Sequence, residues 1–178
     1  MRQTVTFLKQ RAAICIRSGF KLNRLIQRIF KMYKLLSVVF LIGSSVAALA
    51  DTIEVEMLTK NDAGDRMVFS QELIRAEIGD VILFLPTDRS HNAQSVKGAL
   101  PDGQESFKGK QNKAVEYLVT ETGLSAVVCA PHHAMGMVAL IVVGNDLSNA
   151  QQVLDARLRG KGKDKIKALI EQAKATQP

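Results

Sequence analysis

Cysteine is scarce in this chain of 178 residues, which contains only Cys15 and Cys129. Cys15 lies in an N-terminal segment that we expect to be removed, which leaves Cys129 alone and excludes an internal disulfide. A single thiol in an oxidising compartment is vulnerable to oxidation unless it is deeply buried or held as a ligand. The scarcity of cysteine therefore directs attention to the residues around Cys129.

Acidic residues are absent from residues 1–50, which contain nine Lys or Arg. The whole chain has 24 basic and 17 acidic residues, so residues 51–178 keep 15 basic and all 17 acidic ones, a formal charge of −2. The positive net charge of the whole chain, +7, therefore comes from the N-terminal segment, which alone carries +9. It does not indicate a nucleic-acid-binding or membrane-binding domain, and no nucleic-acid partner is expected.

No hydrophobic run reaches the roughly 20 residues that a membrane-spanning helix needs. Residues 35–42, which are apolar except for Ser37, follow a basic start at Lys34 and precede Ala48-Leu49-Ala50, an A-x-A cleavage pattern. We therefore expect residues 32–50 to be a signal peptide and Asp51 to be the first residue of the mature chain. The mature protein is expected to be periplasmic and soluble, with no attachment to the membrane after cleavage.

Residues 1–31 form an extension that an export signal does not need. We expect Met32 to be the true start and residues 1–31 to result from a misassigned one. Alternatively, residues 21–31 place apolar side chains on one helical face with basic residues between them, a pattern typical of a helix on a membrane surface.

Residues 51–145 contain short segments with the period of two or the continuous apolar run that is typical of β-strands. The candidate strands are 52–59, 67–69, 81–85, 115–119, 124–129 and 137–143, and residues 73–76 lead to a turn at Gly79-Asp80. Seven or eight short strands separated by turns predict a fold that is mainly β, an antiparallel Greek-key β-sandwich. A mature chain of this length is enough for one domain with one core.

The hydrophobic period changes after Gly144. Ser148 and Gln151 form a capping box that predicts the start of a helix, and Gly160 and Gly162 are expected to end it before a second helix begins. We expect residues 146–178 to form two α-helices that pack on the sandwich as part of the same domain.

Side chains that bind soft metals are concentrated between residues 129 and 137. They are Cys129, His132, His133, Met135 and Met137. His91 lies 38 positions before Cys129, at the start of a long connection between two predicted strands. Thiolate and thioether sulfur with imidazole is typical of copper, and two His and one Cys with a weak axial Met form an electron-transfer copper site.

Two other interpretations of these residues remain open. Zinc binds Cys and His well, and His133 could complete a closed site, although Met is a poor zinc ligand. A nucleophilic Cys-His pair would need an orienting group and an oxyanion hole that the sequence does not reveal. We therefore favour copper and do not expect an enzyme.

The segments around these residues resemble the pseudoazurins, periplasmic blue-copper proteins of the cupredoxin family. The resemblance covers essentially all of residues 51–178. It is carried by Asp88-Arg89-Ser90-His91-Asn92, by Pro101-Asp102-Gly103, and by Cys129-x-Pro-His132-x-Ala-Met135-Gly-Met137. The fold that it implies is a Greek-key cupredoxin β-sandwich with two C-terminal helices.

The resemblance also implies a ligand set for one copper ion per chain that cycles between Cu(I) and Cu(II). His91, Cys129 and His132 would be the equatorial ligands and Met137 the long axial one, while His133 and Met135 would stay off the metal. The backbone N–H of Asn92 would donate a hydrogen bond to the sulfur of Cys129.

The implied function is that of a monomeric one-electron carrier. Its partners would be redox proteins, possible examples being a copper nitrite reductase or cytochromes. Basic residues would steer acidic partners to the exposed edge of His132. The candidates are Lys60, Arg89, Lys97, Lys108 and Lys110. The alternative function is a copper-binding or copper-delivery protein that does not carry electrons.

Overall fold

The computed structural model describes residues 50–177 of the chain. The expectations for residues 1–31, and for the signal peptide up to residue 49, fall outside the described residues. Within residues 50–177, no helix combines the length and the apolar character that crossing a membrane requires.

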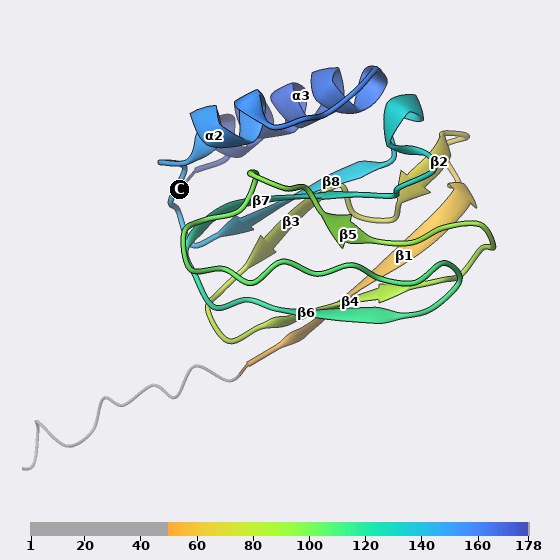
Figure 1. Ribbon diagram of the computed structural model, residues 1–178, viewed down its shortest axis with the longest axis horizontal. Helices are drawn as coiled ribbons and strands as arrows, with labels where there is room; N and C mark the ends of the chain where they lie inside the picture. Colours follow the sequence, from red (N-terminus) through yellow and green to blue (C-terminus); the bar gives the residue numbers. More distant parts are fainter. Residues whose placement is uncertain (1–49, 178) are drawn as a thin grey trace, which may run out of the picture. The chain divides into compact units, whose positions relative to one another are not determined.

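In the described part of the chain, residues 50–177, eight strands form two sheets of four strands each (Figure 1). The first sheet has the order β2-β1-β4-β6 and consists of β1 (Thr52–Lys60), β2 (Arg66–Phe69), β4 (Val81–Leu85) and β6 (Val115–Leu118). The second has the order β3-β8-β7-β5 and consists of β3 (Leu73–Ala76), β5 (Gln94–Ser95), β7 (Gly123–Val128) and β8 (Val138–Val143). The predicted β-sandwich is confirmed.

Each sheet contains one parallel pair of strands, so the expectation of purely antiparallel strands was wrong. β1 runs parallel to β4, with Thr52 opposite Val81, and β3 runs parallel to β8, with Leu73 opposite Leu140. The other neighbours pair antiparallel. Alternation of apolar and polar residues identifies a strand with one buried face, but it is the same in both kinds of pair and does not specify direction.

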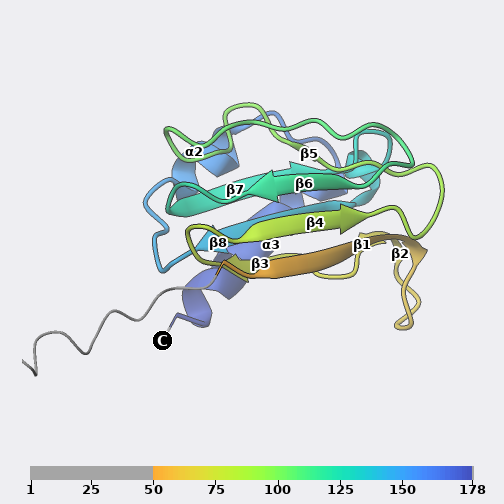
Figure 2. The same cartoon turned by 90° about the horizontal axis from the view of Figure 1, so that it is seen from below.

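Strands β7 and β8 are buried at every position, which explains their continuous apolar sequences. One face of this sheet packs on the first sheet, through a core that includes Phe69, Phe84 and Met137. The other face is covered by the C-terminal helices, through a second cluster that includes Leu140 and Ile166. Figure 2 shows the strands of the first sheet in front of β7 and β8, with α3 behind them.

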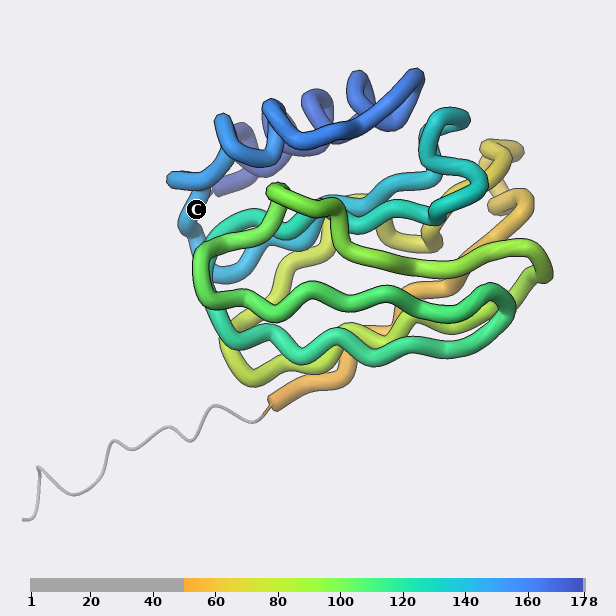
Figure 3. Tube along the Cα trace, in the orientation of Figure 1, coloured from red at the N-terminus to blue at the C-terminus, as the bar shows by residue number. Residues whose placement is uncertain are grey.

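Two helices follow β8, as predicted, but their boundaries differ from the prediction. Helix α2 (Ala150–Asp155) begins after Asn149, not Ser148, and the Asn149 side chain bonds both the N–H and the carbonyl of Leu124. Helix α3 (Lys161–Ala175) begins after Gly160 and contains Gly162 in its first turn. The tube in Figure 3 shows both helices on one side of the sandwich, and the green connection after β5 reaches α2, where Gln152 Nε2 donates to the carbonyl of Leu100 at 3.1 Å.

A buried tyrosine provides a pH-dependent probe of the sandwich core. Tyr117 is 3% exposed, and its hydroxyl lies 3.1 Å from the hydroxyl of Ser125. Burial raises the pKa of Tyr117 to about 12, while the Ser125 hydrogen bond acts in the opposite direction. The other tyrosine of the chain, Tyr33, lies in the N-terminal segment.

We expect the tyrosinate absorbance of Tyr117 to appear near pH 12 in the folded protein. An unfolded chain loses this proton at a pH of about 10, so the unfolded state binds fewer protons than the native state above that pH. Stability should therefore fall as pH rises from about 10 to about 12. The difference in ultraviolet absorbance between the parent protein and Tyr117→Phe isolates this titration, and a midpoint near 10 in the folded protein would contradict it.

Candidate metal centre

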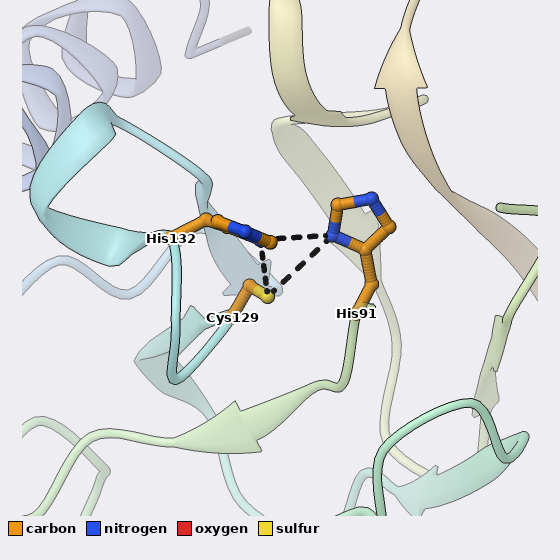
Figure 4. A group of neighbouring side chains, drawn as sticks. All are labelled: His91, Cys129 and His132. Carbon is orange, nitrogen blue, oxygen red and sulfur yellow. Dashed lines mark hydrogen bonds between the residues drawn. The ribbon is translucent and has the colours of Figure 1, made fainter. Parts of the chain in front are cut away.

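Three metal-binding side chains converge at one end of the sandwich (Figure 4). Cys129 directly follows β7, and His132 precedes the short 3-10 helix η1 (His133–Met135) that leads to β8. His91 lies in the loop between β4 and β5. Because β5 pairs with β7, with Gln94 opposite Val128, the residues before β5 are brought beside the residues after β7. Strand pairing therefore closes the gap of 38 residues between His91 and Cys129.

The three side chains present a sulfur and two nitrogens to a common centre. The sulfur of Cys129 lies 3.8 Å from His91 Nδ1 and 3.5 Å from His132 Nδ1, and the two nitrogens are 3.1 Å apart. A point equidistant from these atoms lies about 2 Å from each, close to the length of a metal–imidazole bond. These donors therefore fit one metal ion, and a thiolate with two imidazoles suits copper.

The interior of the sandwich keeps two of these residues from water. His91 and Cys129 are 0% exposed, whereas His132 is partly exposed. Burial lowers the pKa of His91, reinforced by His132 and opposed by Asp88, and burial raises the pKa of the Cys129 thiol. The metal-free site therefore favours a neutral imidazole and a thiol, and a bound cation would displace the thiol proton.

The backbone N–H groups of Asn92 and His132 face the Cys129 sulfur and act against the effect of burial on its pKa. This effect agrees with the expected hydrogen bond from the Asn92 N–H to the sulfur, which stays a prediction. The Asn92 side chain also connects the loop of His91 to the loop of Cys129 and His132, because its Oδ1 accepts from the N–H of Ala130 at 2.8 Å. Its Nδ2 donates to the carbonyl of Gly109, between β5 and β6, at 3.1 Å. Sequence reasoning missed this role of the side chain.

Thr59, at the end of β1, is a further contact that sequence reasoning missed. Its hydroxyl lies 3.2 Å from Nε2 of His91, the ring nitrogen that faces away from Cys129. A hydrogen bond donated by Nε2 leaves Nδ1 unprotonated and directed at the centre. The Thr59 backbone N–H donates to Asp88 Oδ2 at 2.7 Å, which ties β1 to the loop that carries His91. Nothing in the local sequence marks Thr59, because it lies 32 residues before its partner.

The remaining candidates of the sequence motif divide into two groups. His133 and Met135 lie outside the cluster of three, and the His133 ring contacts the carbonyl of Ala130 at 2.9 Å while Met135 is 53% exposed. Met137 is fully buried. Its carbonyl accepts from the N–H of Cys129 at 3.1 Å, and its N–H donates to the carbonyl of His132 at 3.3 Å. The backbone of Met137 thus lies against both residues.

Comparison with known proteins identifies relatives with the same sandwich. Residues 55–144 match the family described as copper binding proteins, plastocyanin/azurin family. A pseudoazurin from Paracoccus pantotrophus is 43% identical over 132 residues, which cover 74% of this chain and 90% of the relative. A second, from Methylorubrum extorquens, is 38% identical and is covered over 89% of its length.

Solved structures agree with these relationships. The native pseudoazurin from Hyphomicrobium denitrificans has a TM-score of 0.64 at 39% identity, covering 68% of this chain and 97% of the other. A pseudoazurin from Sinorhizobium has a TM-score of 0.67 at 34% identity, with 71% and 99% covered. With this sandwich and this convergent Cys and His cluster, the chain belongs to the pseudoazurin family of plastocyanin/azurin-type copper proteins.

Proposed function

We propose that this protein is a periplasmic one-electron carrier in which His91, Cys129, His132 and Met137 would hold one copper ion. As a member of its family the chain is a copper protein and not an enzyme. The observation that carries the proposal is the buried Cys129 sulfur between the two Nδ1 atoms, with separations of 3.8 and 3.5 Å. When bound, the copper ion would accept one electron by reduction from Cu(II) to Cu(I) and release it on reoxidation.

The residues around the cluster suit an electron carrier because they hold the donor atoms in nearly fixed positions. Thr59 holds the His91 ring, and Asn92 holds the two ligand loops together. The backbone of Met137 is bonded to both Cys129 and His132. Little rearrangement is therefore needed between oxidation states, which keeps the barrier to electron transfer low.

The edge of His132 is the proposed route for electrons between the buried site and a partner. His132 is the only one of the three clustered side chains with surface exposure, and Pro131, Ala134 and Met135 beside it are exposed. An exposed apolar surface of this kind allows a partner to approach closely and to exclude water. A delivery protein would need a more accessible metal, so the complete burial of His91 and Cys129 favours the carrier.

A visible spectrum of the copper-loaded protein, recorded before and after a mild reductant, tests the proposal. A carrier should be intensely coloured when oxidised, lose its colour on reduction, and regain it on reoxidation with the copper retained. Loss of copper during the cycle would favour a delivery protein. A colourless protein that prefers zinc would contradict the proposal.

The proposal includes the location and the domain organisation expected from the sequence. Residues 32–50 would act as a signal peptide, residues 51–145 as the copper-binding sandwich, and residues 146–178 as helices of the same monomeric domain. Redox partners are implied by the family, and a copper nitrite reductase or a cytochrome is the partner that we propose.

We expect electron transfer to an acidic redox partner to slow as salt rises. Five basic residues are exposed, and we propose that they surround the docking surface: Lys60, Arg89, Lys97, Lys108 and Lys110. Salt screens long-range attraction, so the second-order rate constant should fall about tenfold between low and high ionic strength. Stopped-flow kinetics measures it.

Charge reversal distinguishes steering by these residues from an effect of net charge. Lys60→Glu should lower the rate constant at low salt, whereas Lys167→Glu changes the net charge equally on an exposed position of α3 and should have little effect. A rate constant that does not depend on ionic strength would contradict the proposed docking surface.

A further inference from the structure

Asp80, at the turn before β4, is the only carboxylate side chain that is buried among residues 50–177, with an exposed fraction of 7%. Its Oδ2 accepts from the N–H of Glu77 at 2.8 Å, and its Oδ1 accepts from the backbone nitrogen of Asp51 at 2.9 Å. These two contacts lower the pKa of Asp80, so the carboxylate is ionised.

The buried charge of Asp80 has no cationic partner among the described residues. The ion pairs found there are Lys165 with Glu72 and Lys174 with Glu171. Buried carboxylates in proteins are normally paired with a cation or bind a metal, because loss of hydration is costly. Two neutral N–H groups satisfy the hydrogen bonds of Asp80 but leave its charge uncompensated.

The nitrogen of Asp51 occupies the place where that cation could arise. Ala50 and Asp51 are exposed, and they follow the A-x-A pattern Ala48-Leu49-Ala50. The Asp51 carbonyl accepts from the N–H of Val81 at 2.8 Å, and Thr52 is paired with Val81 in the sheet. The nitrogen is therefore held at Asp80 by strand pairing, whatever precedes it.

We propose that hydrolysis of the Ala50–Asp51 peptide bond creates an α-ammonium on Asp51 that forms an ion pair with Asp80. Water supplies the atoms of the reaction: the leader leaves with a carboxylate on Ala50, and the released amine of Asp51 takes up a proton at neutral pH. This proposal rests on the export that is part of the proposed function. It places the processing site between Ala50 and Asp51, and it makes the Asp80 carboxylate the ion-pair partner of the new N-terminal ammonium.

Processing then strengthens the fold at the point where β1 begins. An ammonium has three donors where an amide has one, and hydrogen bonds between charged partners are shorter and stronger than neutral ones. The pair joins Asp51, the residue before β1, to the turn before β4, and β1 and β4 are neighbours in the first sheet. The mature chain should therefore be more stable than the same chain with any residue before Asp51.

The experiment compares two forms of residues 51–178, which lie within a single compact unit of the structure. One is the exported protein, whose first residue is established by intact mass. The other is made without export and keeps an initiating Met before Asp51, which turns the Asp51 ammonium into an amide and moves the charge one residue away. Both are prepared with Asp80 and with Asp80→Asn, and thermal unfolding is measured for all four at pH 7.

We expect the exported protein to begin at Asp51 and to unfold about 2 to 5 °C above the Met-extended form, a difference typical of one partly screened ion pair. Asp80→Asn should remove this difference. Asp146→Asn is the matched control, because Asp146 also accepts a backbone N–H, from Ser148 at 2.8 Å, but does not contact Asp51. The difference between the two forms should persist in that control.

A mature chain that begins at another residue would overturn the proposal, and so would equal unfolding temperatures of the two Asp80 forms. A difference that persists in Asp80→Asn would also overturn it. The visible spectrum of each copper-loaded form is recorded in parallel. Because Asp80 lies outside the metal cluster, a failure of the copper proposal would appear as missing colour in all forms, separately from the unfolding temperatures.

Discussion

Replacing Cys129 by serine should abolish the intense visible colour of the copper-loaded protein while leaving the sandwich folded. The colour of a blue-copper site depends on covalency between the metal and the thiolate, which an alcohol oxygen does not provide. Serine is close to cysteine in size, so it creates little cavity at this fully buried position. The backbone N–H groups of Asn92 and His132 that face the sulfur can bond the new hydroxyl instead.

The measurement has two parts, because loss of colour alone could reflect unfolding. Visible absorption of the copper-loaded Cys129→Ser protein should lose most of its intensity. The free energy of unfolding of the metal-free protein, measured by thermal unfolding, should change by only about 1 kcal/mol. Met135→Leu is the matched control, since it removes the sulfur of a residue that is 53% exposed and is not among the four proposed ligands. It should keep the full colour. An intensely coloured Cys129→Ser protein would show that the sulfur of Cys129 is not a ligand.

The candidate site could be predicted from sequence to the extent that its residues are close together in the chain. Cys129 and His132 are three residues apart, so one loop brings them together. His91 could be named as a candidate from its residue type, but it lies 38 residues before Cys129, and its position depends on the pairing of Gln94 with Val128. Thr59 could not be predicted, because its contact with His91 requires the end of β1 to lie beside the loop after β4.

The fold shows the same division between local and remote determinants. The alternation of residues 52–59 and the apolar runs at 81–85 and 137–143 predicted strands where β1, β4 and β8 lie. Which strands pair, and in which direction, is decided by packing between residues far apart in sequence. The predicted start of the first helix differs from the observed one for a related reason. The Asn149 side chain bonds the backbone of Leu124, a partner that no local pattern reveals.

Gly162 is a second position where a contact with a remote residue decides the structure, because the sequence predicted that this glycine would end a helix. It also connects the C-terminal helices to the metal centre. It is buried in the first turn of α3, beside η1, the 3-10 helix that follows His132. A Cβ added to Gly162 would overlap the carbonyl oxygen of His133 and lie 3.0 Å from Cγ1 of Val138. His133 belongs to the segment that joins His132 to β8, and Val138 is the first residue of β8. The backbone oxygen cannot rotate away as a flexible side chain would.

Gly162→Ala should therefore destabilise the protein, although the same change inside an ordinary helix stabilises it by about 1 kcal/mol. Overpacking of this kind costs about 1 to 3 kcal/mol, because either α3 or η1 must move. Movement of η1 displaces His132 relative to Cys129, so the visible band and the reduction potential should shift together with the stability. Lys163→Ala is the control, since Lys163 is exposed in the same turn and its replacement leaves the contact with His133 intact. Unfolding by denaturant measures the free energy of unfolding, and a redox titration measures the reduction potential. A Gly162→Ala protein with higher stability and an unchanged potential would show that α3 does not support the loop that carries His132.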